Sequence, residues 1–182
     1  MKKFAVCYQA SFQELKHVKT LTTAAMLMAV SVVLGYFTIE AGPYLKIGFG
    51  GVVNQFVYYL FGPVAGAVYG GVLDLVKYVV KPTGAFFPGF TLTAFLTGIV
   101  YGVFLYNKPK TWPRIIGAVL TVCLVINLGL DTLWLSILMG KGYIALLPTR
   151  IMKAVLMIPV QTFIIGIIWK KVVVRFVKVS QA

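Results

Sequence analysis

The sequence predicts an all-α integral membrane protein, a single bundle of about six transmembrane helices with both termini in the cytoplasm. Of its 182 residues, 60% are hydrophobic and 14% aromatic, and the mean hydropathy is +0.93. A soluble domain of this length needs far less apolar surface for its core. About 20 apolar residues cross a bilayer, and the chain offers about six stretches if one short stretch is counted. The predicted spans are residues 21–39, 51–62, 64–80, 89–106, 114–139 and 144–169.

The second of these stretches is too short for an upright crossing. It is either buried within the bundle or continuous with the third span through a kink at Gly62-Pro63. Proline lacks the backbone donor that a helix interior needs, so a kink at this point has a physical cause.

Most basic residues fall on one side of the predicted membrane. With an even number of spans, 11 of the 17 Lys and Arg share that side, which the positive-inside rule places in the cytoplasm. Residues 1–20 are then a cytoplasmic tail or surface helix, residues 21–175 the single six-helix transmembrane domain, and residues 176–182 a second cytoplasmic tail. The 11 bases are Lys2, Lys3, Lys16 and Lys19, then Lys108, Lys110 and Arg114, and finally Lys170, Lys171, Arg175 and Lys178.

Several classes of function are disfavoured by what the chain lacks. It has no Gly-x-x-x-x-Gly-Lys-Ser/Thr phosphate loop, so it does not power transport with ATP by itself. The only histidine is His17, and Cys7 and Cys123 form no metal-ligand spacing or disulfide framework. The sequence contains no soluble segment with a basic face and interleaved aromatic residues, so it does not indicate nucleic-acid binding. We therefore expect no enzymatic activity, no metal and no cofactor.

Six basic residues remain outside or within the predicted spans, and they are the main indication of function. A cation in hydrocarbon costs roughly 2.5 to 3.5 kcal/mol on insertion scales and more in simulations, so such charges face a wet cavity or an anion. The acids on the same side are Glu40, Asp74 and Asp131, which leaves three more bases than acids and predicts an external counter-ion. The six bases are Lys46, Lys77, Lys81, Lys141, Arg150 and Lys153.

Two sets of candidate site residues occur around residues 73–90, one polar and one aromatic. Asp74, Lys77 and Tyr78 share one helix face because they are three and four residues apart. Asp74 and Lys77 could instead neutralise each other while Lys81 reaches the interface. The Pro- and Gly-rich turn that follows presents Phe87 and its aromatic neighbours, either as a lipid-anchoring belt or as a surface for a flat ligand ring.

Two further groups lie in the last two predicted spans. Asn127, Asp131 and Trp134 recur at spacings of four and three, so they are expected on one face. Hydrogen bonding between helices is the alternative role for that face. Arg150 and Lys153 share a face near the outer end and have no acidic neighbour in sequence, although helix-end snorkelling would also suit them.

Small residues four apart indicate close approach of helices. Gly66 and Gly70, and likewise Gly98 and Gly102, are expected to pack within the chain. The pair in residues 25–29, Ala25 and Ala29, could equally present a flat outer face to another membrane subunit.

These motifs resemble one family, the substrate-binding S-components of energy-coupling factor (ECF) vitamin transporters, and most closely its folate-specific members. The resemblance covers about residues 20 to 170, and the runs near Lys81 and Arg150 are its most selective part. The motifs are Gly42-Pro-Tyr-Leu-Lys-Ile-Gly-Phe49, Leu60-Phe-Gly-Pro63, Asp74-Leu-Val-Lys-Tyr78, Lys81-Pro-Thr-Gly84, Phe86-Phe-Pro-Gly-Phe-Thr91 and Leu147-Pro-Thr-Arg-Ile-Met-Lys153.

The resemblance implies a multi-pass protein of the bacterial cell membrane that captures folate with high affinity at the extracellular face. Its implied partners are a transmembrane coupling T-component and two cytoplasmic ATPase subunits, which would power uptake. Ala25 and Ala29 match the docking motif of the family's first helix, so they are the expected partner interface.

Folate also suits the residues singled out above, which form the expected substrate-binding site. Its glutamate tail carries two carboxylates, its pterin can stack on aromatic rings, and a buried carboxylate can accept the pterin N–H donors. The loop 40–50 is expected to close over the ligand. Two alternatives stay open: another anionic vitamin such as pantothenate, or a membrane scaffold or regulatory subunit that binds no small molecule. The expected roles are the tail for Lys46, Lys77, Arg150 and Lys153, the ring walls for Tyr78, Phe87 and Trp134, and N–H acceptance for Asp74 or Asp131, with Asn127 beside them.

Overall fold

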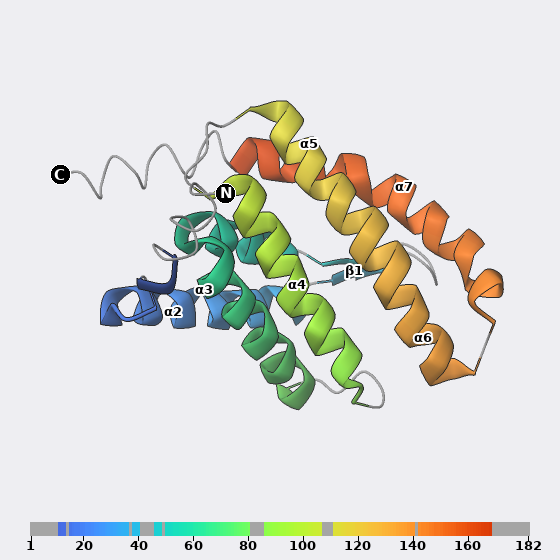
Figure 1. The fold of residues 1–182 in the computed structure, drawn as a ribbon, viewed down its shortest axis with the longest axis horizontal. Coiled ribbons are helices and arrows are strands. Elements are labelled where there is room, and N and C mark those ends of the chain that lie inside the picture. The colour runs from blue at the N-terminus through green and yellow to red at the C-terminus, as the bar shows by residue number, and fades with distance from the viewer. Residues whose placement is uncertain are drawn as a thin grey trace.

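The computed structural model describes residues 11–13, 15–36, 38–40, 46–48, 50–80, 86–106, 111–140 and 142–168. These residues form a helical bundle with one short β-hairpin, which confirms the predicted fold class (Figure 1). The predictions for Lys81, Lys141 and both terminal tails beyond these ranges lie outside the described residues. The elements are α2 (Val18–Tyr36), β1 (Thr38–Glu40), β2 (Lys46–Gly48), α3 (Gly50–Val80), α4 (Pro88–Leu105), α5 (Trp112–Thr121), the π-helix η1 (Val122–Leu130), α6 (Asp131–Met139) and α7 (Tyr143–Ile168).

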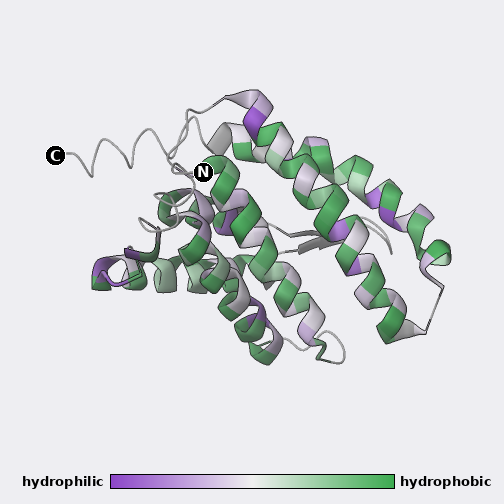
Figure 2. Cartoon of the chain, in the orientation of Figure 1, coloured by the Kyte–Doolittle hydropathy of each residue, from purple (hydrophilic) through white to green (hydrophobic). Residues whose placement is uncertain are grey.

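Five segments of the described chain are long and apolar enough to cross a membrane. Hydrophobic residues predominate along these helices, as Figure 2 shows, and many of their large hydrophobic side chains are exposed. In water such a surface would be unfavourable, whereas in a bilayer it contacts lipid. The predicted fifth span corresponds to α5, η1 and α6, which run on as one helix from Trp112 to Met139.

The predicted second and third spans are the two parts of α3. Gly62 interrupts the helix with a φ of +81°, a left-handed conformation that glycine adopts without a side-chain clash, and Pro63 follows it. Asn54 and Tyr69 would be about 22 Å apart along an unbroken helix. The Tyr69 hydroxyl instead donates to Asn54 Oδ1 at 3.3 Å. The short first part therefore folds back on the second, as an additional helical pass buried in the bundle.

Ser11, from the N-terminal segment, occupies the break in α3. Its fully buried hydroxyl donates to the Phe61 carbonyl at 2.6 Å and accepts from the Val64 and Ala65 amides at 3.0 and 3.2 Å. These are backbone groups that an interrupted helix leaves without partners, and a bilayer offers no water to replace them. One side chain therefore caps both ends of the interruption.

The polypeptide begins and ends its described path at the same end of the bundle. Ser11 and the Tyr106 ring both lie against Gly62, and the Trp112 ring lies against Gly166. The opposite end carries the last turns of α3 and α6 and the first turns of α4 and α7. This arrangement agrees with an even number of helical passes.

The centre of the bundle is formed by α3 and α4. The Tyr58 ring stacks on Tyr101 and meets Tyr69 edge-on, with ring centroids 5.9 and 6.1 Å apart. Gln55 Nε2 donates a hydrogen bond to the Tyr101 hydroxyl at 3.2 Å. The predicted glycine pairs lie at the contact between these helices, where Gly98 faces the backbone of Gly66. No side chain larger than glycine fits there, so the prediction of close helix approach within the chain is confirmed.

The first predicted span ends earlier than expected. Helix α2 stops at Tyr36, and residues 38–40 pair antiparallel with residues 46–48, so that Glu40 lies opposite Lys46 in register. The base of this hairpin is tied to the bundle because the Ser31 hydroxyl lies within hydrogen-bond distance of the Gly50 carbonyl, at 3.1 Å, and of Asn54 Oδ1, at 2.7 Å. The hairpin is the one β-sheet among the residues that the structure describes.

Replacement of Ser11 by alanine tests the role of the cap. We expect Ser11→Ala to lower the unfolding temperature in detergent, because unpartnered buried backbone groups cost about 1–3 kcal/mol. Gln13→Ala, at an exposed position two residues away, is the matched control. Equal unfolding temperatures for the two variants would contradict the capping role.

Candidate functional site

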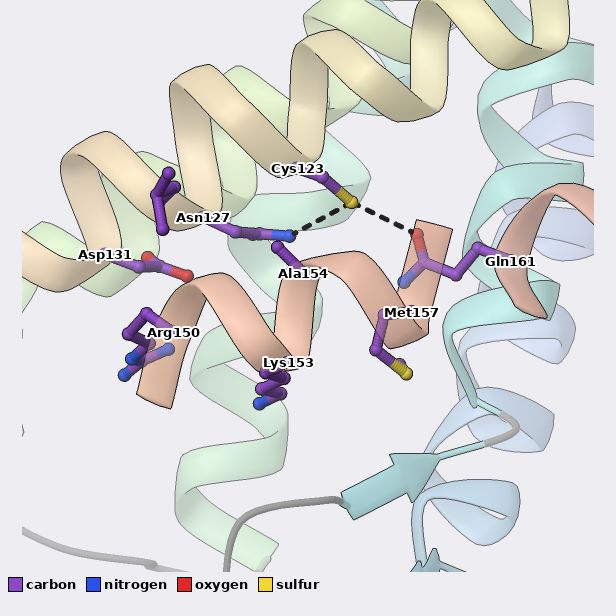
Figure 3. Close-up of a pocket in the computed structure, with 9 residues that line it drawn as sticks. Cys123, Asn127, Asp131, Arg150, Lys153, Ala154, Met157 and Gln161 are labelled. Carbon is purple, nitrogen blue, oxygen red and sulfur yellow. Dashed lines mark hydrogen bonds between the residues drawn. The ribbon is translucent and has the colours of Figure 1, made fainter. Parts of the chain in front are cut away.

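A cavity of about 180 Å³ lies between α7 and the helix formed by η1 and α6 (Figure 3). Four predicted site residues line it, so the structure brings together two groups that lie in different spans. A cavity of this size is smaller than the 300 Å³ or more that encloses a whole drug-sized ligand, so it would hold one part of such a molecule. Its lining consists of Cys123, Asn127, Leu128, Asp131, Arg150, Lys153, Ala154, Met157 and Gln161.

Charged groups of both signs meet in this cavity. Asp131 extends from the first turn of α6, and the positive charges of Arg150 and Lys153 on α7 act on its carboxylate. Asp131 Oδ1 is nevertheless buried and has no hydrogen-bond partner among the described residues. The Thr93 hydroxyl also acts on this carboxyl group. A buried acceptor without a donor is costly, so Oδ1 has unused capacity to accept a hydrogen bond.

Neutral polar side chains line the part of the cavity that lies away from the charged residues. Asn127 Nδ2 approaches the Cys123 thiol at 4.0 Å, and that thiol donates to Gln161 Oε1 at 3.8 Å (Figure 3). Thiols are weak hydrogen-bonding groups. The side-chain amides of Asn127 and Gln161 therefore retain donors and acceptors that can form further hydrogen bonds.

An aromatic wall stands on the other side of α6. The ring centroids of Phe87 and Trp134 are 5.6 Å apart. Phe90 meets Phe87 edge-on, with 6.0 Å between the ring centroids. The Trp134 indole packs on Gly89, where an added Cβ would lie 2.7 Å from the ring. Trp134 Nε1 is the second buried polar atom without a partner in the described chain. The wall thus combines an apolar surface with an unused donor.

The prediction that Asn127, Asp131 and Trp134 share one face is only partly right. Asn127 and Asp131 line the cavity, but Trp134 is turned toward α4. Three residues of α-helix turn through about 300°, which displaces Trp134 by about 60° from Asp131. Asp131 therefore lies on the boundary between the cavity and the aromatic wall.

The predicted residues of α3 lie beside this site without lining the cavity. Asp74 Oδ2 accepts a hydrogen bond from Thr91 of α4 at 2.8 Å, and the described residues contain no Asp74–Lys77 ion pair. The Tyr78 ring contacts Phe86 at 5.1 Å rather than Phe87, and Lys77 extends toward Gly35. Asp74 and Lys77 therefore form no direct salt bridge, although the charge of Asp74 still acts on the Lys77 ammonium group. Lys46 belongs to β2, and only its backbone is described.

Three cavity residues on α7 were not singled out from the sequence, namely Ala154, Met157 and Gln161. Met157 and Gln161 follow Lys153 at intervals of four and eight residues, which is the spacing of a single helix face, and Ala154 lies next to Lys153. That spacing could have identified them, Gln161 above all, because a polar amide inside an apolar span needs a partner.

Ala25 and Ala29 lie on the exposed side of α2. They are one turn apart, and the bundle does not cover them. In a membrane this surface faces lipid or another protein.

A multi-pass helical bundle whose cavity carries two cations, a carboxylate and an adjacent aromatic wall defines a membrane protein that binds a small polar molecule. Residues 19–169 match the family described as "ECF transporter, substrate-specific component". The chain belongs to this family, and it is accordingly a multi-pass protein of the bacterial membrane. The resemblance noted from the sequence motifs is confirmed.

Individual relatives agree with this assignment. The chain is 35% identical over 158 residues to the folate transporter FolT of Clostridium novyi, which covers 87% of this chain and 92% of that protein. It is 31% identical over 143 residues to FolT of Leuconostoc mesenteroides, with 75% and 77% covered. A crystal structure of FolT bound with folic acid superimposes with a TM-score of 0.72 at 37% identity, over 80% of this chain and 88% of the other.

The contact of Trp134 with Gly89 can be tested without a ligand. We expect Gly89→Ala to shift the fluorescence of Trp134 and to destabilise the fold by about 1–3 kcal/mol, because the new methyl group overpacks the wall. The measurement uses a background in which Trp112→Phe and Trp169→Phe leave Trp134 as the only tryptophan. Gly51→Ala, where a Cβ meets open space, is the control, and an unchanged spectrum for both variants would contradict the contact.

Proposed function

We propose that this protein captures folate at the extracellular face and delivers it inward as the substrate-binding component of an ATP-driven ECF transporter. The observation that carries the proposal is the buried Asp131 carboxylate, which lacks a hydrogen-bond donor on Oδ1 and faces Arg150 and Lys153 across a cavity. The likeness to folate transporters, one of them solved with folic acid, supports this choice of ligand.

The two parts of the site suit the two ends of folate. The cavity holds the glutamate end, where Arg150 can contact a carboxylate in bidentate fashion and Lys153 supplies a second cation. The pterin lies against Phe87 and Trp134, whose flat surfaces favour offset stacking. Asp131, between the two parts, accepts the N–H donors of the pterin. The small volume of the cavity is then explained, because the ring lies outside it.

Lys46, Lys77 and Asp74 complete the proposed site at its margin. Lys77 lies near the end of α2, and Lys46 belongs to the hairpin. In the proposed site both lysines border the approach to the cavity. The hairpin closes over the bound ligand, and the two lysines attract its negative tail before contact. Asp74 holds α4 in place through Thr91, while Tyr78 extends the aromatic surface through Phe86.

We assign the orientation from the distribution of charge and the partners from the family to which the chain belongs. Lys16, Lys19 and Arg114 are exposed at the end of the bundle where the described chain begins, and that end is cytoplasmic by the positive-inside rule. The cavity then opens toward the outside. Ala25 and Ala29 dock the T-component, which transmits ATP hydrolysis by two cytoplasmic ATPase subunits.

Comparison of folate with pteroate, which lacks the glutamate, tests the assignment of the two ends. We expect Arg150→Ala to weaken folate binding by about 2 kcal/mol or more, roughly 30-fold, because it removes a desolvated charge pair. Pteroate binding should be unchanged in that variant, whereas Asp131→Asn should weaken both ligands equally. Binding is measured by isothermal titration in detergent.

Arg114→Ala, which removes an exposed arginine at the opposite end, is the matched control. Pantothenate, an anion without a flat ring, should not compete with folate. If Arg150→Ala weakened pteroate as much as folate, the glutamate end would not lie at Arg150. If the wild-type protein bound no folate, the proposed function itself would be wrong.

The proposed docking surface, formed by Ala25 and Ala29 of α2, has a separate test. Substitutions there are expected to affect transport but not folate capture. Combined Ala25→Trp and Ala29→Trp substitutions should leave folate affinity in detergent unchanged and abolish uptake by cells, since large side chains keep a partner helix away. Ala145→Trp, at an exposed alanine of α7, is the control and should transport normally. Normal uptake by the α2 variant would contradict the assignment of this surface.

A further inference from the structure

The helix that carries Asn127 and Asp131 changes its hydrogen-bond pattern beside the cavity. In α5 the pattern is α-helical, and the Val122 amide still reaches the carbonyl of Ala118, four residues earlier. Through η1 it is that of a π-helix, and the Asp131 amide donates to Ile126, five residues earlier. Such wide turns are uncommon and occur most often at functional sites.

A return from five-residue to four-residue pairing leaves one backbone carbonyl without an amide donor. In a bilayer that carbonyl must find another partner within the protein. The Thr132 hydroxyl, which is fully buried, donates to the carbonyl of Asn127 at 3.3 Å. The next carbonyl, that of Leu128, accepts from the Tyr143 hydroxyl at 3.2 Å.

The reach of Thr132 distinguishes it from other threonines in the bundle. The hydroxyls of Thr93, Thr121 and Thr162 each donate to the carbonyl four residues earlier, as in a regular α-helix. Thr132 reaches back five residues, to the carbonyl at the widened turn. Its bond is therefore specific to the π-helical geometry.

Both donors bond to residues of the cavity wall. Thr132 adjoins Asp131, and the carbonyls that accept the two bonds belong to Asn127 and Leu128, which line the cavity. Tyr143 begins α7, two turns before Arg150. Its bond ties α7 directly to the π-helix, so it joins the helix that carries the cations to the helix that carries the carboxylate.

We propose that Thr132 and Tyr143 are positioning residues that hold the π-helical turn open and thereby align Asn127 with Asp131 in the cavity. Without their hydroxyls, the segment relaxes toward four-residue pairing. A π-helix turns less per residue than an α-helix, so relaxation rotates Asn127 and Cys123 relative to Asp131. The effect on folate rests on the proposed function, whereas the effect on the helix does not.

The test compares two substitutions of Thr132 with one substitution of a control residue, Thr121. Thr132→Val keeps the shape of the side chain and removes the donor, Thr132→Ser restores the donor, and Thr121→Val removes a hydroxyl of ordinary reach from the same long helix. We expect Thr132→Val to weaken folate binding about tenfold, because a buried carbonyl loses its partner. Thr132→Ser and Thr121→Val should bind folate like the wild-type protein.

A second measurement reports on the helix without any ligand. In a Cys7→Ser background Cys123 is the only thiol, and it lines the cavity in contact with Asn127 and Gln161. Rotation of the segment breaks these contacts, so N-ethylmaleimide should label Cys123 faster in Thr132→Val than in the other two variants. This readout distinguishes failure of the positioning role from failure of folate as the ligand.

Unchanged labelling and unchanged folate binding in Thr132→Val would overturn the proposal. Equal losses in Thr132→Val and Thr132→Ser would also overturn it, because packing rather than the hydroxyl would then matter. If Thr132→Val does not fold, Tyr143→Phe decides the question at a partly exposed position. Faster Cys123 labelling in Tyr143→Phe supports the proposal, and wild-type labelling overturns it.

Discussion

The structure depends on one constraint, that every backbone amide and carbonyl within a bilayer must find its partner inside the protein. A regular helix meets this requirement by itself, so each irregularity needs an added donor or acceptor. At Gly62 the added group is the hydroxyl of Ser11, which bonds to three backbone groups across the break. At the end of η1 it is the hydroxyl of Thr132. Both irregularities are therefore stable features. One folds α3 back on itself, and the other, in our proposal, aligns Asn127 with Asp131.

The same requirement, applied to side chains, supports the proposed position of the ligand. Within the described chain, the buried side-chain atoms without a hydrogen-bond partner are Asp131 Oδ1 and Trp134 Nε1, an acceptor and a donor one helical turn apart. Each is costly to leave alone in an apolar bundle. Their position, with the cations of α7 on one side and the aromatic wall on the other, indicates a guest that has an anionic end and a flat polar ring. Folate has both features.

The sequence supported the fold well and the site only in part. Apolar length located the spans within a few residues, and the break at Gly62-Pro63 was expected because proline and glycine leave few other conformations. Arg150 and Lys153 were identified because charges are rare in such spans. Helical spacing alone grouped Trp134 with Asp131, although one lies on the wall and the other in the cavity, because periodicity does not tell which neighbour each side of a helix faces.

The sequence by itself determined that this chain lies in a membrane and located its spans to within a few residues, and it predicted more basic than acidic residues at the outer side of the bundle. These properties follow from the local cost of placing polar groups in hydrocarbon, which each segment carries regardless of its neighbours. Only the tertiary structure decided that Asp131 lies between the cations and the aromatic wall, that Asp74 bonds to Thr91 rather than to Lys77, and that η1 is π-helical. Those outcomes depend on which partners the packing of distant helices brings within hydrogen-bond distance, and no local pattern contains that information.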